Sequence, residues 1–240
     1  MVTFPCAKLN LGLEILRKRL DGFHDIDSVF YPIPFHDALE AVPERRSFST
    51  HFHFSGMEIP GRSSDNLIAK ALEHLRKETV IPPLTVFLHK AIPMGAGLGG
   101  GSSDAAFFLK LVNSLCDQPV SMETLEKIAA ELGSDCSFFL DPHPKRATGR
   151  GEKLEPIELD LTGKKLVVVC PEIHVSTAEA YAGVTPREDL PSPADIVKLP
   201  MVEWQAKLVN RFEESVFVKY PELKYTKEHL ISSGAIYASM

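Results

Sequence analysis

The densest group of glycines lies in the stretch PMGAGLGGGSSDAAFFL, which begins at Pro93. Five of the seven positions from Gly95 to Gly101 are glycine. Glycine loses more backbone freedom on folding than any other residue, so this grouping indicates that a ligand comes close to the backbone. Converging N–H groups beside the positive end of a helix form a site for phosphate. Ser102 and Ser103 would add hydroxyl donors or a magnesium contact.

Other glycine-rich loop types explain this stretch less well. Gly95, Gly97 and Gly100 satisfy the dinucleotide pattern G-x-G-x-x-G, but several elements precede the loop, and only Glu123 lies near the expected acidic position. A Walker A loop needs Lys and then Ser or Thr after its last glycine, and Gly-Ser follows here instead. The V-A-I-K, H-R-D and D-F-G sequences of protein kinases are absent. The residues therefore favour a phosphate cradle that needs no lysine.

Several polar residues outside the loop have side chains of types that can do chemistry. Lys8 and Asn10 lie on the polar face of an alternating stretch, and Asp135 follows the end of an expected helix. Taken singly, each would ordinarily be a surface or turn residue, and the histidine beside the Asp-Gly turn would be solvated. His51 and His53 have a spacing that metals use, but no third ligand is evident, so we expect both to be exposed.

Strands and helices are mixed along the chain, and the loop lies between a strand and a helix. Alternating or continuous apolar runs predict strands at 7–16, 47–54, 84–92 and 164–171, with another beginning at 234–240. Helical spacing predicts helices at 67–78, 102–115, 121–132 and 203–217. The first helix has N-cap candidates at 64–66, and Gly133 is the expected C-cap of the third. A domain boundary is expected near 145–160.

Composition excludes several classes of protein. The chain has 240 residues, with 44% hydrophobic and 24% charged residues, which are ordinary values for a globular protein. A net charge of −6 argues against a broad surface for nucleic acid or an anionic membrane, so an anionic ligand must be met by local donors. The N-terminus lacks a signal-peptide core, so we expect a cytoplasmic protein. Its four scattered cysteines are expected to be reduced and buried.

Five motifs carry a resemblance to a known family. PMGAGLGGGSSDAA resembles the phosphate loop of the GHMP small-molecule kinases. The other four resemble segments of those members that phosphorylate a cytidine-diphosphate alcohol: PCAKLNLGLEILRKRLDGFHD, LGSDCSFFL, ATGRGEKLEPI and HVSTAEAY. The matches run in order from about residue 5 to residue 181, and five motifs in order are far more specific than one.

The resemblance implies an α/β (α+β) GHMP kinase fold. A ribosomal-protein-S5-domain-2-like N-terminal domain would span 1–155, and a ferredoxin-like α/β C-terminal domain would span 156–240. The implied reaction moves the γ-phosphate of ATP, with Mg²⁺, to the 2-hydroxyl of a cytidine-diphospho-methylerythritol in the non-mevalonate isoprenoid pathway. The expected partner is this small molecule, without nucleic acid or membrane. Monomer and weak homodimer both stay open.

The resemblance also implies a role for each matching residue in catalysis. Asp135 would be the catalytic base, and Lys8 would keep its carboxylate ionised and stabilise charge on the transferring phosphoryl group. Asn10 would orient the acceptor alcohol. A lysine beside a carboxylate lowers the pKa of that carboxylate, which agrees with this assignment.

The implied binding residues form two groups. Asn66, Leu67 and Lys90 would lie near the adenine. The triphosphate cradle would consist of Pro93, Met94, Gly95, Ala96, Gly97, Leu98, Gly99, Gly100, Gly101, Ser102 and Ser103. Phe23 and Tyr181 would stack on the cytosine, while His24 would form hydrogen bonds with its edge.

The sequence departs from the family pattern at three places. DGFH stands where DGYH is commoner, and Ala96 stands where glycine is usual. After GAIYASM, the family's glycine-serine segment is expected but the sequence stops, so we expect a C-terminally incomplete fold. Two alternatives stay open: a GHMP kinase for another alcohol, and a nucleotide-binding member impaired in catalysis. A glutamate that commonly binds magnesium in other GHMP kinases has no counterpart before Glu123.

Overall fold

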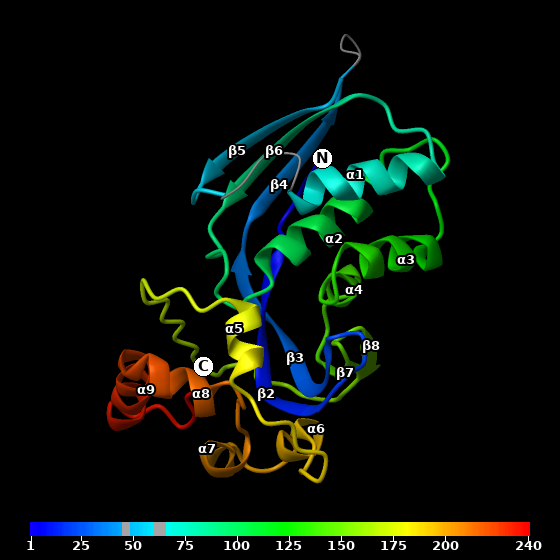
Figure 1. The fold of residues 1–240 in the computed structure, drawn as a ribbon. Helices are drawn as coiled ribbons and strands as arrows, with labels where there is room; N and C mark the ends of the chain where they lie inside the picture. The colour runs from blue at the N-terminus through cyan, green and yellow to red at the C-terminus, as the bar shows by residue number, and fades with distance from the viewer. Residues whose placement is uncertain (45–48, 60–65) are drawn as a thin grey trace. The chain divides into compact units, whose positions relative to one another are not determined.

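The computed structural model describes residues 1–44, 49–59 and 66–240. Its internal contacts divide the chain into two compact units, each containing one sheet (Figure 1). Unit 1 consists of Met1–Lys8 and Pro32–Pro142, and unit 2 consists of Leu9–Tyr31 and His143–Met240. The contacts therefore group an early segment with the C-terminal part. The expected division into domains 1–155 and 156–240 remains a prediction.

The sheet of unit 1 has the strand order β1-β4-β6-β5. The strands are β1 (Val2–Thr3), β4 (Ala38–Pro43), β5 (His51–Gly56) and β6 (Leu84–Lys90). β4 pairs antiparallel with β1 and β6, whereas β5 pairs parallel with β6. Alternate residues of β6 are buried, as the period of a half-buried strand requires. The prediction of a strand near 47–54 is confirmed from residue 51 onward, and its residues 47–48 lie outside the described ones.

The helices of unit 1 lie beside this sheet (Figure 1). They are α1 (Leu67–Glu78), α2 (Gly100–Asn113), α3 (Met122–Leu132) and α4 (Cys136–Leu140). α1 starts at Asn66, whose side chain accepts a hydrogen bond from the N–H of Ile68, and α3 starts at Ser121 and ends at Gly133. The predicted helices are confirmed here because both their apolar spacing and their capping residues are local signals. The other N-cap candidates, 64 and 65, lie outside the described residues.

The sheet of unit 2 has the order β2-β3-β7-β8, and its strands β2 and β3 extend into the residues of unit 1. The strands are β2 (Cys6–Lys18), β3 (His24–His36), β7 (Lys145–Gly149) and β8 (Lys153–Pro156). β7 pairs antiparallel with β3 and β8. Alternation along β2 predicts a solvent-facing polar side, but Lys8 and Glu14 are each only 3% exposed. Side chains cover both faces of β2, which periodicity alone does not show.

The C-terminal part of unit 2 is helical. Its helices are α5 (Thr177–Ala182), α6 (Pro193–Ile196), α7 (Trp204–Lys207), α8 (Glu213–Lys219) and α9 (Pro221–Ser232), with a short 3₁₀ turn at Met201–Glu203. An apolar cluster joins α6 and α7 to β2 and β3 through Leu11, Val29, Ile196 and Trp204. The predicted continuous helix at 203–217 is wrong because α7 and α8 are separate.

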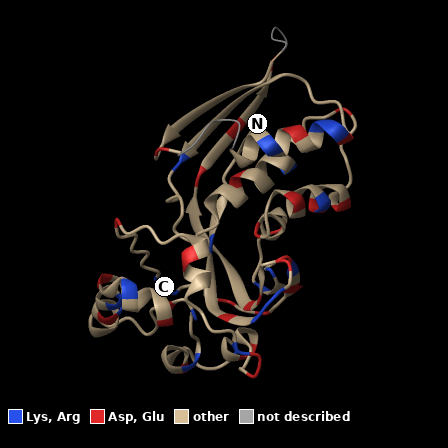
Figure 2. Cartoon of the chain, viewed as in Figure 1, with Lys and Arg blue, Asp and Glu red and all other residues tan. Residues whose placement is uncertain are grey.

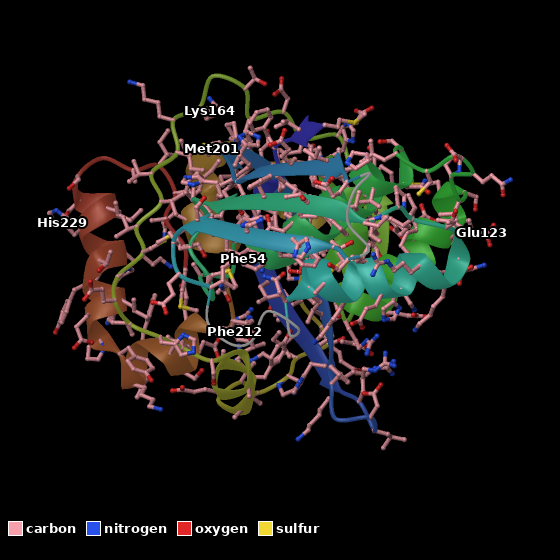
Figure 3. The ribbon with its side chains drawn as sticks, turned by 90° about the horizontal axis from the view of Figure 1, so that it is seen from above. Phe54, Glu123, Lys164, Met201, Phe212 and His229 are labelled. Carbon is pink, nitrogen blue, oxygen red and sulfur yellow. The ribbon has the colours of Figure 1, made fainter. Side chains whose placement is uncertain are left out.

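Two predicted strands do not form. Lys164–Pro171 has no strand, and its apolar side chains are exposed: Leu166 52%, Val167 69%, Val168 39% and Val169 46%. Lys164 lies on an irregular segment in Figure 3. Residues 234–240 also have no strand. An apolar run becomes a strand only where another strand pairs with it, and the described part of the chain offers no such partner to either segment.

The remaining expectations concern cysteines, histidines and charge. Cys6, Cys116 and Cys136 are buried, but Cys170 is exposed, so the expectation of four buried cysteines is wrong at that position. His51 and His53 are exposed, and the described residues contain no group of three metal-ligating side chains.

Positive and negative residues are interspersed in both units (Figure 2). No helix among the described residues is long and apolar enough to span a membrane.

Candidate active site

The glycine loop, Pro93–Ser103, follows β6 and includes the first turn of α2, all within unit 1. Gly95, Gly97 and Gly99 have φ angles of 72°, 73° and 71°. L side chains rarely adopt this left-handed region, so the shape of the loop requires glycine at these positions. Residues 94–97 are exposed, whereas Leu98 is buried and anchors the loop.

The glycine loop is closely packed at Gly99 and Gly100 and open at Gly97. A Cβ atom at Gly99 would lie 2.7 Å from the Phe139 ring, and one at Gly100 would lie 2.9 Å from Ile92 Cγ2. A Cβ at Gly97 would meet no atom within 4 Å. Gly99 is the N-cap of α2 and provides no side-chain cap. The first N–H groups of α2, with the helix dipole behind them, are therefore suited to an anion.

Lys8 and Asp135 form an ion pair within unit 1. Lys8 Nζ lies 3.2 Å from Asp135 Oδ2, and the two side chains are 4% and 32% exposed. Asp135 is the residue before α4, and its side chain makes no capping hydrogen bond to that helix. The carboxylate can therefore be reached from solvent, while the ammonium is held in the interior beside it.

The ion pair is contiguous with the glycine loop. The backbone N–H of Lys8 donates to the carbonyl of Leu98 at 2.9 Å. A Cβ at Gly99 would lie 3.1 Å from Lys8 Cγ. The structure therefore places the lysine and the aspartate expected from the sequence beside the N-terminus of α2. This arrangement brings the backbone donors at the start of α2 close to an ammonium and a carboxylate.

Asn66 and Leu67 begin α1, near the exit of the loop. The side-chain oxygen of Asn66 accepts the N–H of Ile68 at 2.9 Å and caps the helix. A Cβ at Gly101 would lie 3.8 Å from Leu67 Cδ1. The starts of α1 and α2 are therefore neighbours, which agrees with their expected shared role at one nucleotide.

Lys90 occupies a different environment from the one expected of an adenine contact. Its side chain is fully buried, and its ammonium pairs with Asp37 and Asp104. An ammonium in that position has no surface to offer a ligand. In this arrangement only the backbone of Lys90 could contact a nucleotide. That contact remains a prediction.

The residues expected at the cytidine end lie in unit 2. The rings of His24 and Tyr181 stack with centroids 4.8 Å apart, and Phe212 meets Tyr181 edge-on at 4.9 Å. Tyr181 and Phe212 pack against an apolar group on β2 and β3 that includes Ile26. These contacts fix an aromatic group beside the turn between the two strands.

Phe23, the residue before His24, has an exposed ring, and His24 itself is neutral at pH 7. Phe23 is 52% exposed, and the Arg150 guanidinium lies 4.8 Å from its ring centroid. Burial, and then the charge of Lys18, lower the pKa of His24 below its ordinary 6.5. The imidazole is therefore neutral at pH 7, with one donor and one acceptor nitrogen, as reading a base edge requires. Asn10 is half-buried on β2 in the same unit.

Sequence reasoning missed three residues of these sites. Asp37 and Asp104 bind Lys90 beneath the glycine loop, and Arg150 covers one face of Phe23. A carboxylate among apolar residues, as in SSDAAFFL, was the available signal for Asp104. Nothing in the local sequence links Asp37 to a lysine 53 positions later.

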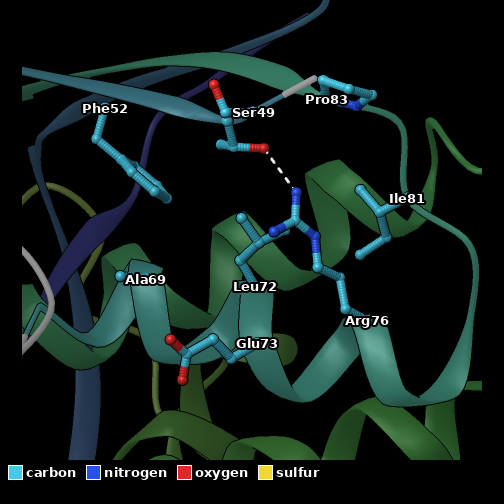
Figure 4. Close-up of a pocket in the computed structure, with 9 residues that line it drawn as sticks. Ser49, Phe52, Ala69, Leu72, Glu73, Arg76, Ile81 and Pro83 are labelled. Carbon is cyan, nitrogen blue, oxygen red and sulfur yellow. Dashed lines mark hydrogen bonds between the residues drawn. The ribbon is translucent and has the colours of Figure 1, made fainter. Parts of the chain in front are cut away.

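A surface pocket of about 600 Å³ lies elsewhere in unit 1 (Figure 4). Its lining comes from one face of α1, the start of β5 and the residues before β6. Arg76 reaches across it and donates to Thr50 Oγ1 at 2.8 Å. None of the expected site residues lines this pocket.

A family model and several curated proteins match this chain. Residues 66–141 match the model of the GHMP kinases N terminal domain. A 4-diphosphocytidyl-2-C-methyl-D-erythritol kinase of Parabacteroides distasonis is 47% identical over 240 residues, covering 100% of this chain and 88% of that protein. One from Cytophaga hutchinsonii is 46% identical over 241 residues, with the same coverage.

A solved structure agrees with the sequence relatives. The crystal structure of a 4-(cytidine 5'-diphospho)-2C-methyl-D-erythritol kinase superposes with a TM-score of 0.78 at 30% identity. It covers 100% of this chain and 86% of that one. Near-complete coverage at these identities, together with the glycine loop and the Lys8–Asp135 pair, leads to one conclusion. The chain belongs to the 4-diphosphocytidyl-2-C-methyl-D-erythritol kinases of the GHMP kinase family.

Proposed function

We propose that this chain transfers the γ-phosphoryl group of ATP to the 2-hydroxyl of 4-diphosphocytidyl-2-C-methyl-D-erythritol. The observation that carries the proposal is the Lys8–Asp135 ion pair packed against Gly99, in a chain 47% identical to a kinase with this name. Phosphoryl transfer depends on positioning and on charge stabilisation more than on covalent chemistry. A phosphate cradle, an ammonium and a carboxylate supply these requirements.

Asp135 is the proposed base in this reaction. Its carboxylate accepts the proton of the 2-hydroxyl as the oxygen–phosphorus bond forms and the bond to the leaving ADP breaks. A weak base suffices, because the proton is lost late in a largely dissociative transfer. Lys8 orients the carboxylate and stabilises negative charge on the transferring group.

The nucleotide is proposed to bind along the glycine loop. N–H groups at the start of α2 meet the phosphate oxygens, and the open space at Gly97 leaves room for them. Asn66 and Leu67 lie at the neighbouring start of α1, which suits contacts to the adenosine. Ser102 and Ser103 belong to the first turn of α2.

Magnesium is proposed to accompany ATP rather than to occupy a protein cage. Mg²⁺ ordinarily retains waters and uses substrate phosphates with one or two protein oxygens. The described residues form no group of three ligating side chains, which fits that mode of binding. When bound, the ion neutralises charge on the phosphates.

The cytidine end of the substrate is proposed to bind at the aromatic group of unit 2. Phe23 presents an exposed ring for stacking, and Tyr181 supplies a second ring. His24 pairs with the base edge through a neutral imidazole. Because His24 and Tyr181 stack on each other, the base inserts only if these rings separate. Asn10 is assigned to the acceptor alcohol.

A substrate panel tests this function. ADP release is measured with the cytidylyl substrate, methylerythritol phosphate, homoserine and galactose. We expect turnover on the first alone, and a loss on the order of 10²–10⁴-fold in kcat for Asp135→Asn. Asp117→Asn, which changes an exposed carboxylate of the same unit, is the matched control. Faster turnover of another alcohol would contradict the proposed substrate, and an active Asp135→Asn protein would contradict the base.

A further inference from the structure

Three ionisable side chains are buried together beneath the glycine loop. Asp37 precedes β4, Lys90 ends β6, and Asp104 lies in the early part of α2. The side chains of Asp37 and Lys90 are 0% exposed, and that of Asp104 is 4% exposed. Burying such charges is expensive and seldom adds net stability over apolar residues of similar size. Net stability therefore does not account for the burial of these three charges, which indicates another role.

Asp37 binds the chain at the entrance to the loop. Its Oδ1 accepts the backbone N–H groups of Ala91 and Ile92, at 2.6 and 2.9 Å. These residues directly precede Pro93, where the loop begins. The N–H of Asp37 donates to the carbonyl of Pro5 at 2.9 Å, close to the start of β2 and to Lys8. One aspartate therefore fixes the loop entrance to the strand that carries the catalytic lysine.

The same aspartate is connected to the exit of the loop. Its Oδ2 accepts a hydrogen bond from Lys90 Nζ, which also donates to Asp104 Oδ2 at 2.7 Å. A Cβ at Gly100 would lie 3.2 Å from Lys90 Nζ, so the first turn of α2 rests on the ammonium. The network thus contacts the loop before its first residue and at its helical end.

We propose that Asp37 is a positioning residue that holds the two ends of the glycine loop in the geometry that binds ATP. It acts directly on Ala91 and Ile92 and, through Lys90, on Asp104. This inference rests on the proposed use of the loop for ATP. Because hydrogen bonds to a charged group are strong, cutting them releases the loop without touching the ligand.

The raised pKa of Asp104 fits a network centred on Asp37. Burial raises the pKa of Asp104 to about 7, against the pull of Lys90 and with a further rise from the Asp37 charge. Asp104 Oδ1 and the neighbouring Ser103 Oγ are buried, with no hydrogen-bond partner among the described residues. Lys90 thus donates to two carboxylates, and of these Asp37 also accepts the backbone N–H groups of Ala91 and Ile92, just before the loop.

Asp37→Asn tests the proposal, because it keeps the size of the side chain and removes its charge. We expect the Kd and KM for ATP to rise on the order of 10–100-fold, the usual consequence of losing hydrogen bonds to a charged group. The KM for the alcohol should stay within about twofold, since the cytidine residues belong to unit 2. Asp104→Asn keeps the entrance contacts and should raise the ATP KM less than Asp37→Asn.

Asn113→Ala is the matched structural control. Asn113 also joins backbone groups at one end of α2, donating to Val120 O at 3.0 Å and accepting from Val120 N at 2.8 Å. It should lower the Tm without changing the Kd for ATP. An Asp37→Asn protein with a lower Tm but an unchanged Kd for ATP would overturn the proposal. So would equal increases in both KM values.

Two further measurements keep the test decisive. If Asp37→Asn does not fold, amide exchange of the wild-type protein replaces it. Ala91 and Ile92 should then exchange as slowly as β6, and exchange as fast as at Gly97 would overturn the proposal. Direct titration with ATP needs no acceptor alcohol. A wild-type chain that binds ATP but phosphorylates nothing would contradict the proposed function and still leave the role of Asp37 measurable.

Discussion

Lys8 and Asp135 depend on their surroundings for any reactivity. The lysine is on a strand whose two faces are both covered, and its ammonium lies 3.2 Å from a carboxylate that is 32% exposed. Two charges that lie close together interact more strongly where little water screens them. The sequence motifs identified both residues, but alternation along β2 suggested a surface lysine. The polar face of β2 is buried because segments distant in the sequence pack against it. The local alternation of residues carries no information about those contacts.

Replacing Lys8 with methionine tests the charge of this pair. Methionine fills a similar volume, so the fold should persist while the stabilisation of the transferring group is lost. We expect kcat to fall on the order of 10²–10³-fold, the usual range for one electrostatic group, with the ATP Kd much less affected. Lys77→Met, at an exposed position in α1, is the control. A Lys8→Met protein with wild-type kcat would contradict the role given to the ammonium.

His24 predicts a pH dependence at the cytidine end. Its pKa is lowered from 6.5, so the ring is mostly neutral at pH 7 and becomes protonated as the pH falls below 6.5. A protonated ring has two donors and no acceptor. The KM for the alcohol should therefore be flat from neutral pH upward and rise on the acid side. His24→Asn should remove this acid rise, and its persistence in that variant would assign it to another group.

At the scale of elements, the glycine loop owes its shape to backbone angles and close contacts. Gly99 has φ +71°, and a Cβ there would meet the Phe139 ring at 2.7 Å. Gly101 is helical, and a Cβ there would approach only Leu67, at 3.8 Å. The glycines are therefore not equivalent. Those before α2 set the turn, whereas Gly101 continues the helix.

Thermal unfolding can separate these two kinds of glycine. Gly99→Ala should cost roughly 2–4 kcal/mol, from left-handed strain together with overpacking against Phe139. Gly101→Ala should leave the stability unchanged or raise it, because alanine is favoured within a helix. Equal stability losses in the two variants would contradict the described shape of the loop.

The same scale shows which elements a sequence can predict. α1 and α3 have both an apolar stripe and polar N-caps, so their limits were predictable. The expected helix at 203–217 is interrupted because backbone groups of Val209 and Arg211 bond to Leu13 of β2. That contact joins residues far apart in the chain, so no local window reveals it. The apolar run at 164–171 has strand-forming residues but no strand partner within the described chain.

At the scale of the whole molecule, the proposed chemistry is divided between two units. Unit 1 contains the glycine loop, Lys8 and Asp135, while unit 2 contains Phe23, His24 and Tyr181. With a net charge of −6, the chain offers no general attraction to two anionic substrates. In the proposed function, binding therefore comes from local groups, namely the start of α2 and the residues around β2 and β3. Colinear motifs pointed to these groups, and their roles remain predictions; the motifs gave no sign of the buried charges beneath the glycine loop.

The central claim is that this chain phosphorylates the 2-hydroxyl of the cytidylyl substrate through Asp135. Phosphorus NMR of the purified chain with ATP, Mg²⁺ and this substrate tests it most directly. We predict a new phosphomonoester signal coupled to the 2-position, growing in equal amount with ADP and absent from the Asp135→Asn sample. Intact ATP after prolonged incubation with the wild-type chain, or ADP formed without the phosphomonoester, would contradict the claim.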